Sequence, residues 1–231
     1  MTQRLRVTFA KEGPLRWVAH LDLMRTWERT IRRAVLPLSY SQGFSPHAKI
    51  ALAAPLPVGV EGRGELIDLW LDDTLRLEDV AKRLAAAMPP GLSISEVKQV
   101  SDDLPSMQSC LLAARYEVLF DADDLDRVDL EAALERLLAL ESLEWEERRG
   151  KKTRNYDLRA TVLEAAVDLV DAGTLCLRLH LSLEPGRTGR PAQVLKAMEI
   201  EVEPRATIRT EIEFTGAGRG TSVGTAVVQP S

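Results

Sequence analysis

The stretch RLRVTFAKEGPLRWVAHLDLMRTWERTIRRAVLP, residues 4–37, contains two different hydrophobic repeats in direct succession. Leu5, Val7 and Phe9 alternate with polar or small neighbours, which predicts a half-buried β-strand. A Gly-Pro pair interrupts this pattern, and apolar residues then recur near helical spacing until Pro37. The stretch therefore predicts a strand followed by a helix.

The predicted helix starts near His20, and its apolar positions lie at helical spacing. We expect the inward residues to be Leu21, Met24, Ile31 and Val35. Outward from this stretch, the first half has a short apolar segment at 50–56, strand patterns at 64–71 and 92–100 and a helix pattern at 77–88. The second half has strand patterns at 116–120, 145, 162–170, 175–183 and 207–214, and helix patterns at 125–140 and 191–198.

Each half thus contains the order strand, helix, strand, strand, helix, strand. Two successive βαββαβ orders predict an α+β protein of two tandem ferredoxin-like domains with antiparallel sheets. We expect an N-terminal domain at 1–100 and a C-terminal domain at 110–214. Residues 215–231 are rich in Gly, Ser and Thr, which predicts a disordered tail.

Composition narrows the possible classes of protein. The chain has 231 residues, is 45% hydrophobic and has a net charge of -5. It contains no apolar run near the roughly 20 residues that a membrane span needs, and its first residues lack the apolar core of a secretory signal. We therefore expect a cytoplasmic protein. Two distant cysteines and three scattered histidines predict neither a disulfide framework nor a metal or iron-sulfur site in this chain.

Positive charge is concentrated in the first quarter of the chain. Residues 1–60 have nine Lys or Arg against three acids, a balance of +6, so the remaining residues carry -11. Local fields of this kind steer a polyanion even when the net charge is negative. On the predicted helix, Asp22, Arg25, Arg29 and Arg32 or Arg33 form one stripe. The stripe is either a phosphate-binding ridge or a solvated face with pairs such as Asp22 with Arg25.

A turn-rich segment, SYSQGFSPHAK at residues 39–49, follows the helix. It combines an aromatic ring with hydroxyl and cationic groups, a combination typical of single-stranded nucleic-acid binding. The candidate binding residues of the helix and this segment are His20, Asp22, Arg25, Arg29, Arg33, Tyr40, Ser41, Gly43, Phe44, His47 and Lys49. In the alternative interpretation, Phe44 anchors a long loop to the core.

Two further basic segments lie in the second half. RRGKKTR, residues 148–154, contributes Lys151, Lys152 and Arg154 in a predicted loop. EPGRTGRP, residues 184–191, places Arg187 and Arg190 just before a predicted helix, where backbone N–H groups favour an anion. We include all five residues among the candidate RNA- or partner-binding positions.

The run PLRWVAHLDLMRTWERTIRRAVLPLSYSQGFSPHAKIALAAPLPVG resembles the opening of the radical SAM-linked protein family, a bacterial domain of unknown function. The matching positions are His20, Leu21, Asp22, Arg25, Arg33, Ala34, Pro37, Tyr40, Ser41, Gly43, Phe44, Pro46, Pro55, Leu56, Pro57 and Gly59. The departures are Ala19 for serine, Ser45 for asparagine and Ala48 for proline. The resemblance implies a radical SAM partner that carries an iron-sulfur cluster, S-adenosylmethionine and cobalamin, with no cofactor in this chain, which lacks CxxxCxxC.

These observations favour a non-catalytic accessory protein that binds RNA or presents a substrate for tRNA or rRNA modification, without a membrane or DNA partner. A second hypothesis is a metal-independent ribonuclease of the CRISPR repeat-endonuclease type. There, His20 would act as acid or base, Tyr40 or Lys49 would assist, and Arg187 and Arg190 would hold phosphate. A third hypothesis is a protein–protein adaptor whose arginine stripe binds an acidic partner surface.

Overall fold

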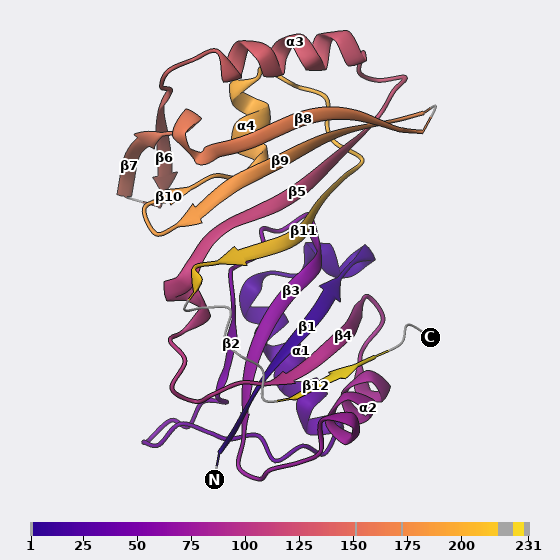
Figure 1. The fold of residues 1–231 in the computed structure, drawn as a ribbon, viewed down its shortest axis with the longest axis vertical. Coiled ribbons are helices and arrows are strands. Elements are labelled where there is room, and N and C mark those ends of the chain that lie inside the picture. The colour runs from indigo at the N-terminus through magenta and orange to yellow at the C-terminus, as the bar shows by residue number, and fades with distance from the viewer. Residues whose placement is uncertain (1, 151, 172, 217–223, 229–231) are drawn as a thin grey trace. The chain divides into compact units, whose positions relative to one another are not determined.

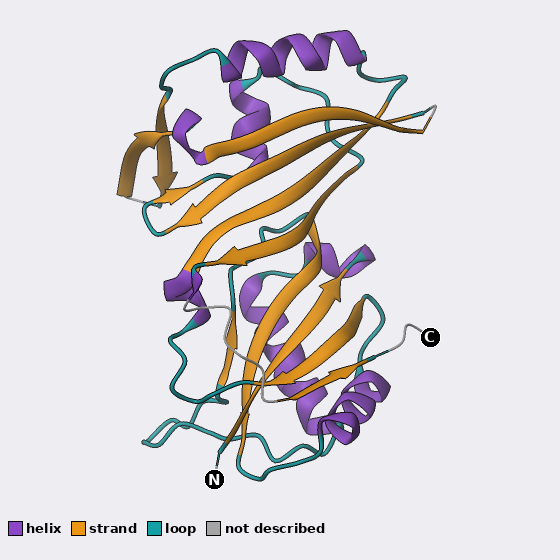
Figure 2. Ribbon diagram, in the orientation of Figure 1, coloured by secondary structure: helices purple, strands orange, loops and turns teal. Residues whose placement is uncertain are grey.

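A computed structural model describes residues 2–150, 152–171, 173–216 and 224–228 of the chain. The described residues form four α-helices and predominantly antiparallel sheets, so the predicted α+β class is confirmed (Figures 1 and 2). None of these helices has the length and apolar character needed to cross a membrane. The chain divides into two compact units: unit 1 comprises 1–111 and 214–231, and unit 2 comprises 112–213.

Unit 1 is an antiparallel sheet with two helices. Its elements are β1 (Gln3–Lys11), α1 (His20–Arg33), β2 (Ile50–Leu52), β3 (Val60–Leu71), α2 (Leu77–Ala87), β4 (Leu92–Gln99) and β12 (Gly224–Val227). The strands lie in the order β12-β4-β1-β3-β2, and each neighbouring pair is antiparallel. The predicted order of strands and helices in the first half is found here.

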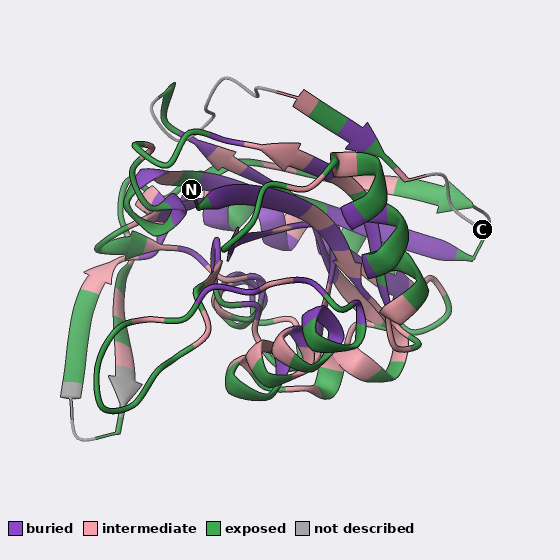
Figure 3. Cartoon of the chain, turned by 90° about the horizontal axis from the view of Figure 1, so that it is seen from below, coloured by how far each residue is buried: buried purple, intermediate pink, exposed green. Residues whose placement is uncertain are grey.

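The core of unit 1 lies between one face of this sheet and the two helices. Alternate residues of β1, including Leu5, Val7 and Phe9, are fully buried there. Figure 3 shows that buried positions run along these strands, whereas the helices have both buried and exposed positions. α2 contributes Val80 and Leu84 to this core.

The inward face of α1 differs from the prediction. Leu23, Trp27 and Ile31, four residues apart, are buried, whereas Leu21 and Val35 are 69% and 77% exposed. Residues at i and i+4 lie one above the other on a helix, so this spacing defines the buried stripe. The hydrophobic pattern alone did not distinguish Trp27, which lies between polar neighbours, from the exposed Leu21.

α1 ends in a Schellman motif formed by a residue with an unusual backbone conformation. Val35 has φ 52°, its N–H donates to the carbonyl of Arg32, and the N–H of Leu36 donates to the carbonyl of Ile31. This pattern satisfies the last carbonyls of the helix, and glycine is the usual residue at the left-handed position. A β-branched residue with positive φ is strained, so Val35 destabilises the helix end that it closes.

We expect Val35→Gly to raise the free energy of unfolding by about 1 kcal/mol, since it removes this strain at an exposed site. Urea denaturation followed by circular dichroism measures the change. Val58→Gly is the matched control: Val58 is also exposed, and its φ is not positive. If Val35→Gly lowered the free energy of unfolding, Val35 would not be strained in the native chain.

Unit 2 likewise combines antiparallel strands with its own helices. Its elements are β5 (Leu111–Asp121), α3 (Arg127–Leu138), β6 (Glu144–Arg149), β7 (Lys152–Asp157), β8 (Val162–Asp171), β9 (Thr174–Glu184), β10 (Arg187–Thr188), α4 (Pro191–Ala197) and β11 (Ala206–Phe214). Its long strands lie in the order β8-β9-β5-β11, and β6 pairs with β7 in a separate hairpin. The basic segment at 148–154, predicted as a loop, is thus part of a hairpin.

The prediction of disorder for residues 215–231 is wrong for Gly224–Val227. This segment forms β12, which pairs with β4, and Ala226 is buried in the core of unit 1. The backbone N–H and C=O groups of the β4 edge give such a strand its hydrogen-bond partners, so a Gly- and Thr-rich composition does not prevent order. Residues 217–223 and 229–231 of the predicted tail lie outside the described residues.

Candidate functional site

One face of α1 presents the arginines that the sequence singled out. Its exposed charged residues are Asp22, Arg25, Arg29, Arg32 and Arg33. Arg25 pairs with Asp22 at 3.0 Å and Arg32 pairs with Glu28 at 2.9 Å. Such exposed pairs contribute only about 0.2–0.5 kcal/mol each. Because α1 has four arginines and two acids, the helix keeps an excess of two positive charges.

The loop of residues 39–49, here called the GF loop, is closed at its base. Tyr40 and Ala48 form an antiparallel bridge. Between them, the backbone N–H of Ser41 donates to the carbonyl of His47 at 2.8 Å, and the N–H of His47 donates to Oγ of Ser41 at 2.9 Å. These hydrogen bonds fix the base of the loop and therefore the position from which its tip projects.

The tip of the GF loop projects an aromatic ring. Phe44 is fully exposed and follows Gly43, whose φ of 132° is a conformation that other residues rarely adopt. The interpretation in which Phe44 anchors the loop to the core is therefore wrong. His47 and Lys49 are exposed on the same loop. An exposed phenylalanine on a hydrogen-bonded loop is available for stacking with a ligand.

A direct contact joins the GF loop to α1. The side chain of Tyr40 interacts with the Arg32 guanidinium, and this interaction raises the pKa of Arg32. Tyr40 is itself 38% exposed. The loop base thus lies beside the C-terminal turn of α1, where Arg33 also lies.

His20 lies at the opposite end of α1 from this contact. Twelve residues separate it from Arg32, which corresponds to about 18 Å along the helix axis. Its Nδ1 is buried without a hydrogen-bond partner among the described residues. Along α1, the residue that Tyr40 contacts therefore lies more than three helical turns from His20.

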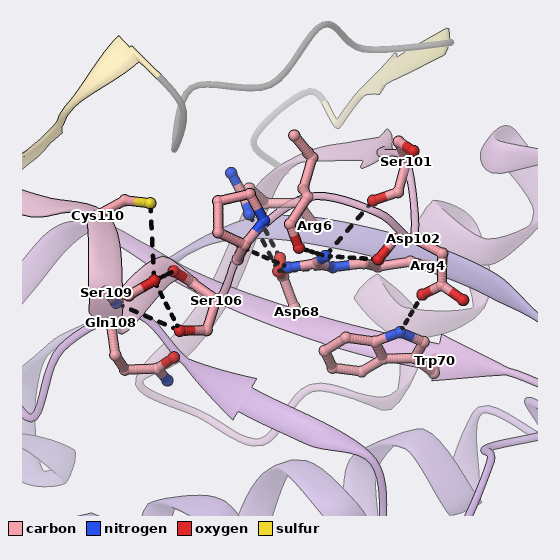
Figure 4. Close-up of polar contacts among 12 residues, drawn as sticks. Arg4, Arg6, Asp68, Trp70, Ser101, Asp102, Ser106, Gln108, Ser109 and Cys110 are labelled. Carbon is pink, nitrogen blue, oxygen red and sulfur yellow. Dashed lines mark hydrogen bonds and ion pairs between the residues drawn. The ribbon is translucent and has the colours of Figure 1, made fainter.

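Three basic residues of the first quarter are buried rather than exposed. Arg4 and Arg6 on β1 both pair with Asp68 on β3, at 2.7 and 2.8 Å, with side chains at most 7% exposed (Figure 4). The Nζ of Lys11 is also inside, where it donates to the carbonyl of Val18 at 3.1 Å. The exposed positive charge of the first quarter is therefore smaller than the sequence suggested, and the four arginines of α1 carry most of it.

The segment that follows β4 covers the Arg4 side chain. Arg4 donates to the carbonyls of Leu104 and Pro105 at 2.7 and 3.3 Å and lies 5.0 Å from the ring centre of Trp70. The indole N–H of Trp70 donates to Asp102 at 2.7 Å (Figure 4). These contacts cover the polar side of β1 next to Asp68, so a ligand cannot reach Arg4 and Arg6 there.

The basic candidates of unit 2 are bound to other groups of the protein. Arg154 donates to the carbonyl of Gly186 and lies 5.5 Å from the ring centre of Tyr156. Arg187 donates to the carbonyl of Ala160 at 2.9 Å, and Arg190 pairs with Glu147. Lys151 and the side chain of Lys152 lie outside the described residues.

The EPGRTGRP segment is a β-turn region rather than an isolated anion-binding loop. It connects β9 with β10, where Arg187 pairs with Glu184 in the strand register. Arg190 precedes the seven-residue α4, whose backbone N–H groups at Gln193 and Val194 bond to the Arg190 carbonyl. The arginines of this segment therefore contribute to holding the turn, the hairpin and α4 together.

Unit 2 contains a groove that sequence reasoning missed. It is a hollow of about 420 Å³ on one face of the sheet, and its lining includes Arg115, Glu164, Arg178, His180 and Thr210. Arg115 on β5 donates to Glu213 at 3.1 Å and to Glu164 at 3.3 Å. Desolvation opposes the charge of Arg115, but these carboxylates outweigh it and raise the pKa of the guanidinium.

His180 is one of the residues that line this groove. Its Nε2 is 3.1 Å from Glu213 and its Nδ1 is 3.7 Å from Glu164, and its side chain is 12% exposed. Both nitrogens are buried, and neither makes a hydrogen bond of good geometry with a described residue. The strand alternation that placed Leu177 and Leu179 inward could have assigned His180 to the opposite face, but only the strand order reveals its partners.

The described residues contain no group of three or more His, Cys, Asp or Glu side chains arranged to hold a metal ion. The chemistry available at α1 and the GF loop is stacking and phosphate contact. The chemistry available in the groove of unit 2 is hydrogen bonding and charge pairing around one imidazole.

The protein thus has an α+β fold of two units, the first of which has an arginine-bearing first helix. The family model described as an uncharacterized protein conserved in bacteria (DUF2344) matches residues 4–191. The chain belongs to this family. The match includes α1, the GF loop and most of the groove, but not β11. No curated protein matches the chain.

Solved structures give only distant similarity. A protein of unknown function from Galdieria sulphuraria is 14% identical, with a TM-score of 0.26, and the alignment covers 86% of this chain and 91% of that one. A putative glycine cleavage system transcriptional repressor is 10% identical, with a TM-score of 0.24, covering 86% of this chain and 90% of that one. Likeness at this level carries no functional argument.

Proposed function

We propose that the protein is a non-catalytic, cytoplasmic RNA-binding module that contacts single-stranded RNA through α1 and the GF loop. The observation that carries the proposal is the fully exposed Phe44 on a hydrogen-bonded loop whose base contacts Arg32. Aromatic stacking combined with nearby cations is the usual means by which proteins hold single strands. A DNA or membrane partner is not part of this proposal.

We also propose that each unit is a ferredoxin-like domain. The strand orders β4-β1-β3-β2 in unit 1 and β11-β5-β9-β8 in unit 2 support this assignment. Unit 1 follows a βαββαβ order of elements, and unit 2 follows the same order with the β6-β7 hairpin and β10 added to it. The open sheet face would not be the RNA site of unit 1, because the segment after β4 covers Arg4 there. The binding surface is instead the helix and loop.

The resemblance to radical SAM-linked proteins supports the proposal that this module acts together with a partner enzyme. In the proposal, a radical SAM enzyme supplies the iron-sulfur cluster, S-adenosylmethionine and cobalamin, and the present chain holds the tRNA or rRNA that is modified. Asp22, Arg25 and the GF loop belong to the motif that carries the resemblance. The same surface would therefore serve RNA binding near the partner enzyme.

Binding of a fluorescent single-stranded RNA, measured by anisotropy over a range of salt concentrations, tests the proposal. We expect Phe44→Ala to weaken binding about five- to hundredfold, the range for loss of one stacked base. The double charge reversal Arg25→Glu with Arg29→Glu should also reduce the salt slope, by about 1.4 if two phosphate contacts are lost.

Matched controls carry the same changes elsewhere. Leu169→Ala removes another exposed hydrophobic side chain, and Lys82→Glu with Arg83→Glu reverses two exposed charges on α2. If the control and test variants lose RNA affinity equally, binding is unspecific, and α1 and the GF loop are not the binding site. If the variant with Arg25→Glu and Arg29→Glu no longer copurifies with the partner enzyme but still binds RNA, the adaptor hypothesis is favoured.

A further inference from the structure

The segment before α1 presents a second exposed aromatic ring. Trp17 ends a short 3-10 helix, Gly13–Trp17, and precedes His20, the first residue of α1, by three positions. Trp17 is 62% exposed, whereas tryptophan is on average a largely buried residue. Packing of the core therefore does not account for a tryptophan at this position.

Two neighbours hold the Trp17 ring in place. Gly59 has φ 87°, and a Cβ atom added to it would lie 3.2 Å from Cζ3 of Trp17, so the ring lies directly against the Gly59 backbone. The Arg16 guanidinium lies 5.3 Å from the ring centre and pairs with Glu61 at 3.4 Å. A ring that is already held in position loses little conformational freedom when a ligand stacks on it.

The exposed face of α1 connects this ring to the GF loop. The exposed residues that lie within about 80° of one another around the helix are Leu21, Arg25, Arg29 and Arg32. Arg29 donates to the neutral hydroxyl of Thr26 at 3.3 Å, a contact that leaves the positive charge of Arg29 available to a phosphate. Trp17 precedes this row of residues, and the loop that carries Phe44 begins beyond its other end.

A single RNA strand has the chemistry that this arrangement would recognise. Its phosphates are negative and regularly spaced, and its bases present flat faces that stack on aromatic rings. α1 has four arginines against two acids, so the surface between the two rings is complementary in charge to such a strand.

We propose that Trp17 is a second base-stacking site for the RNA strand that Phe44 holds. This inference rests on the proposed RNA-binding function and adds a length requirement to it. One base stacks on each ring, and the phosphates between the two bases contact Arg25 and Arg29.

The length of α1 sets the shortest RNA that reaches both rings. His20 and Arg32 are about 18 Å apart along the helix axis. A stacked strand advances about 3.4 Å per nucleotide, so about five nucleotides cover this length. A three-nucleotide RNA therefore contacts one ring at a time. A ten-nucleotide RNA contacts both rings and gains the avidity of two linked sites.

Fluorescence anisotropy of the full chain with labelled uridine RNAs of three and ten nucleotides tests the inference. We expect Trp17→Ala to weaken binding of the ten-nucleotide RNA about five- to hundredfold, the range for loss of one stacked base. The same variant should change the affinity for the three-nucleotide RNA by no more than about twofold, because the Phe44 site remains. Trp17→Phe keeps an aromatic ring and should restore most of the affinity for the longer RNA.

Val128→Ala is the control variant, because Val128 is 69% exposed on α3 of unit 2 and belongs to neither stacking site. It should leave the affinities for both RNAs unchanged. Urea denaturation of Trp17→Ala verifies that the variant is folded, as expected for the loss of an exposed side chain.

The outcomes separate this inference from the proposed function. If the native chain binds neither RNA, both are wrong. If Phe44→Ala weakens binding of the ten-nucleotide RNA but Trp17→Ala weakens it no more than Val128→Ala does, the RNA-binding proposal stands and Trp17 is not a stacking site. Equal weakening of both RNAs by Trp17→Ala also overturns the inference, because the two rings would then belong to one site.

Discussion

Replacement of Trp27 by alanine should lower the free energy of unfolding by about 3–5 kcal/mol, the usual cost of removing a large aromatic side chain from a core. Trp27 is fully buried on α1, and its ring meets that of Phe9 edge-on, with centroids 5.0 Å apart and planes at 74°. The ring therefore connects the helix to the central strand of unit 1, and its loss leaves a cavity between them. Urea denaturation measures the change.

Two companion variants make this expectation specific. Trp17→Ala removes a tryptophan that is 62% exposed, so it should cost far less than Trp27→Ala. Trp27→Phe keeps most of the ring and removes an indole N–H that is buried without a described partner, so its cost should lie well below that of alanine. Similar costs for Trp27→Ala and Trp17→Ala would contradict the packing described here.

Replacement of Asp68 by alanine is expected to destabilise unit 1 by about 3–5 kcal/mol, the range for breaking a buried ion pair from one side. Asp68 is 1% exposed and accepts hydrogen bonds from both Arg4 and Arg6. Without its carboxylate, two buried guanidiniums lose their shared countercharge. Thermal and urea unfolding of the variant measure the loss, provided that both are followed at one pH and ionic strength.

The control for Asp68 is Asp73→Ala, an exposed aspartate at the end of the same strand region, which should change stability by less than about 0.5 kcal/mol. Joint replacement of Arg4, Arg6 and Asp68 by apolar residues should cost much less than Asp68→Ala, because no buried charge is then left unpaired. If the triple variant were as unstable as Asp68→Ala, the cost of Asp68→Ala would not come from leaving two buried guanidiniums unpaired. The interactions of the three charged side chains would then themselves stabilise the sheet.

The sequence predicted the elements of this fold well because most strands and helices have a clear local period. The limits of α2 and β4 differ from the prediction by one residue, and those of α3 by two at each end. Patterns that involve one face of one element are visible without the rest of the chain. The GF loop was likewise visible, since Gly43 and Pro46 mark a turn and Phe44 has no apolar neighbour in sequence.

What could not be predicted depends on residues far apart in the chain. Arg6 alternates with apolar neighbours and should face solvent, yet Asp68, 62 residues later, gives it a buried partner. His180 acquires its two carboxylates only because β8 and β11 lie on either side of the β9-β5 pair. Local periodicity contains no information on register, so neither cluster could be found from sequence alone.

The pairing of β12 with β4 has a consequence for synthesis of the chain. Unit 1 is interrupted after residue 111 and resumes at residue 214. The N–H of Thr215 donates to the carbonyl of Cys110 at 2.9 Å, so the chain leaves unit 1 and returns to it at neighbouring positions. Unit 2 is therefore an insertion whose two ends meet. Since translation proceeds from the N-terminus, all of unit 2 leaves the ribosome before the last strand of unit 1. The first unit to begin folding is the last to be completed.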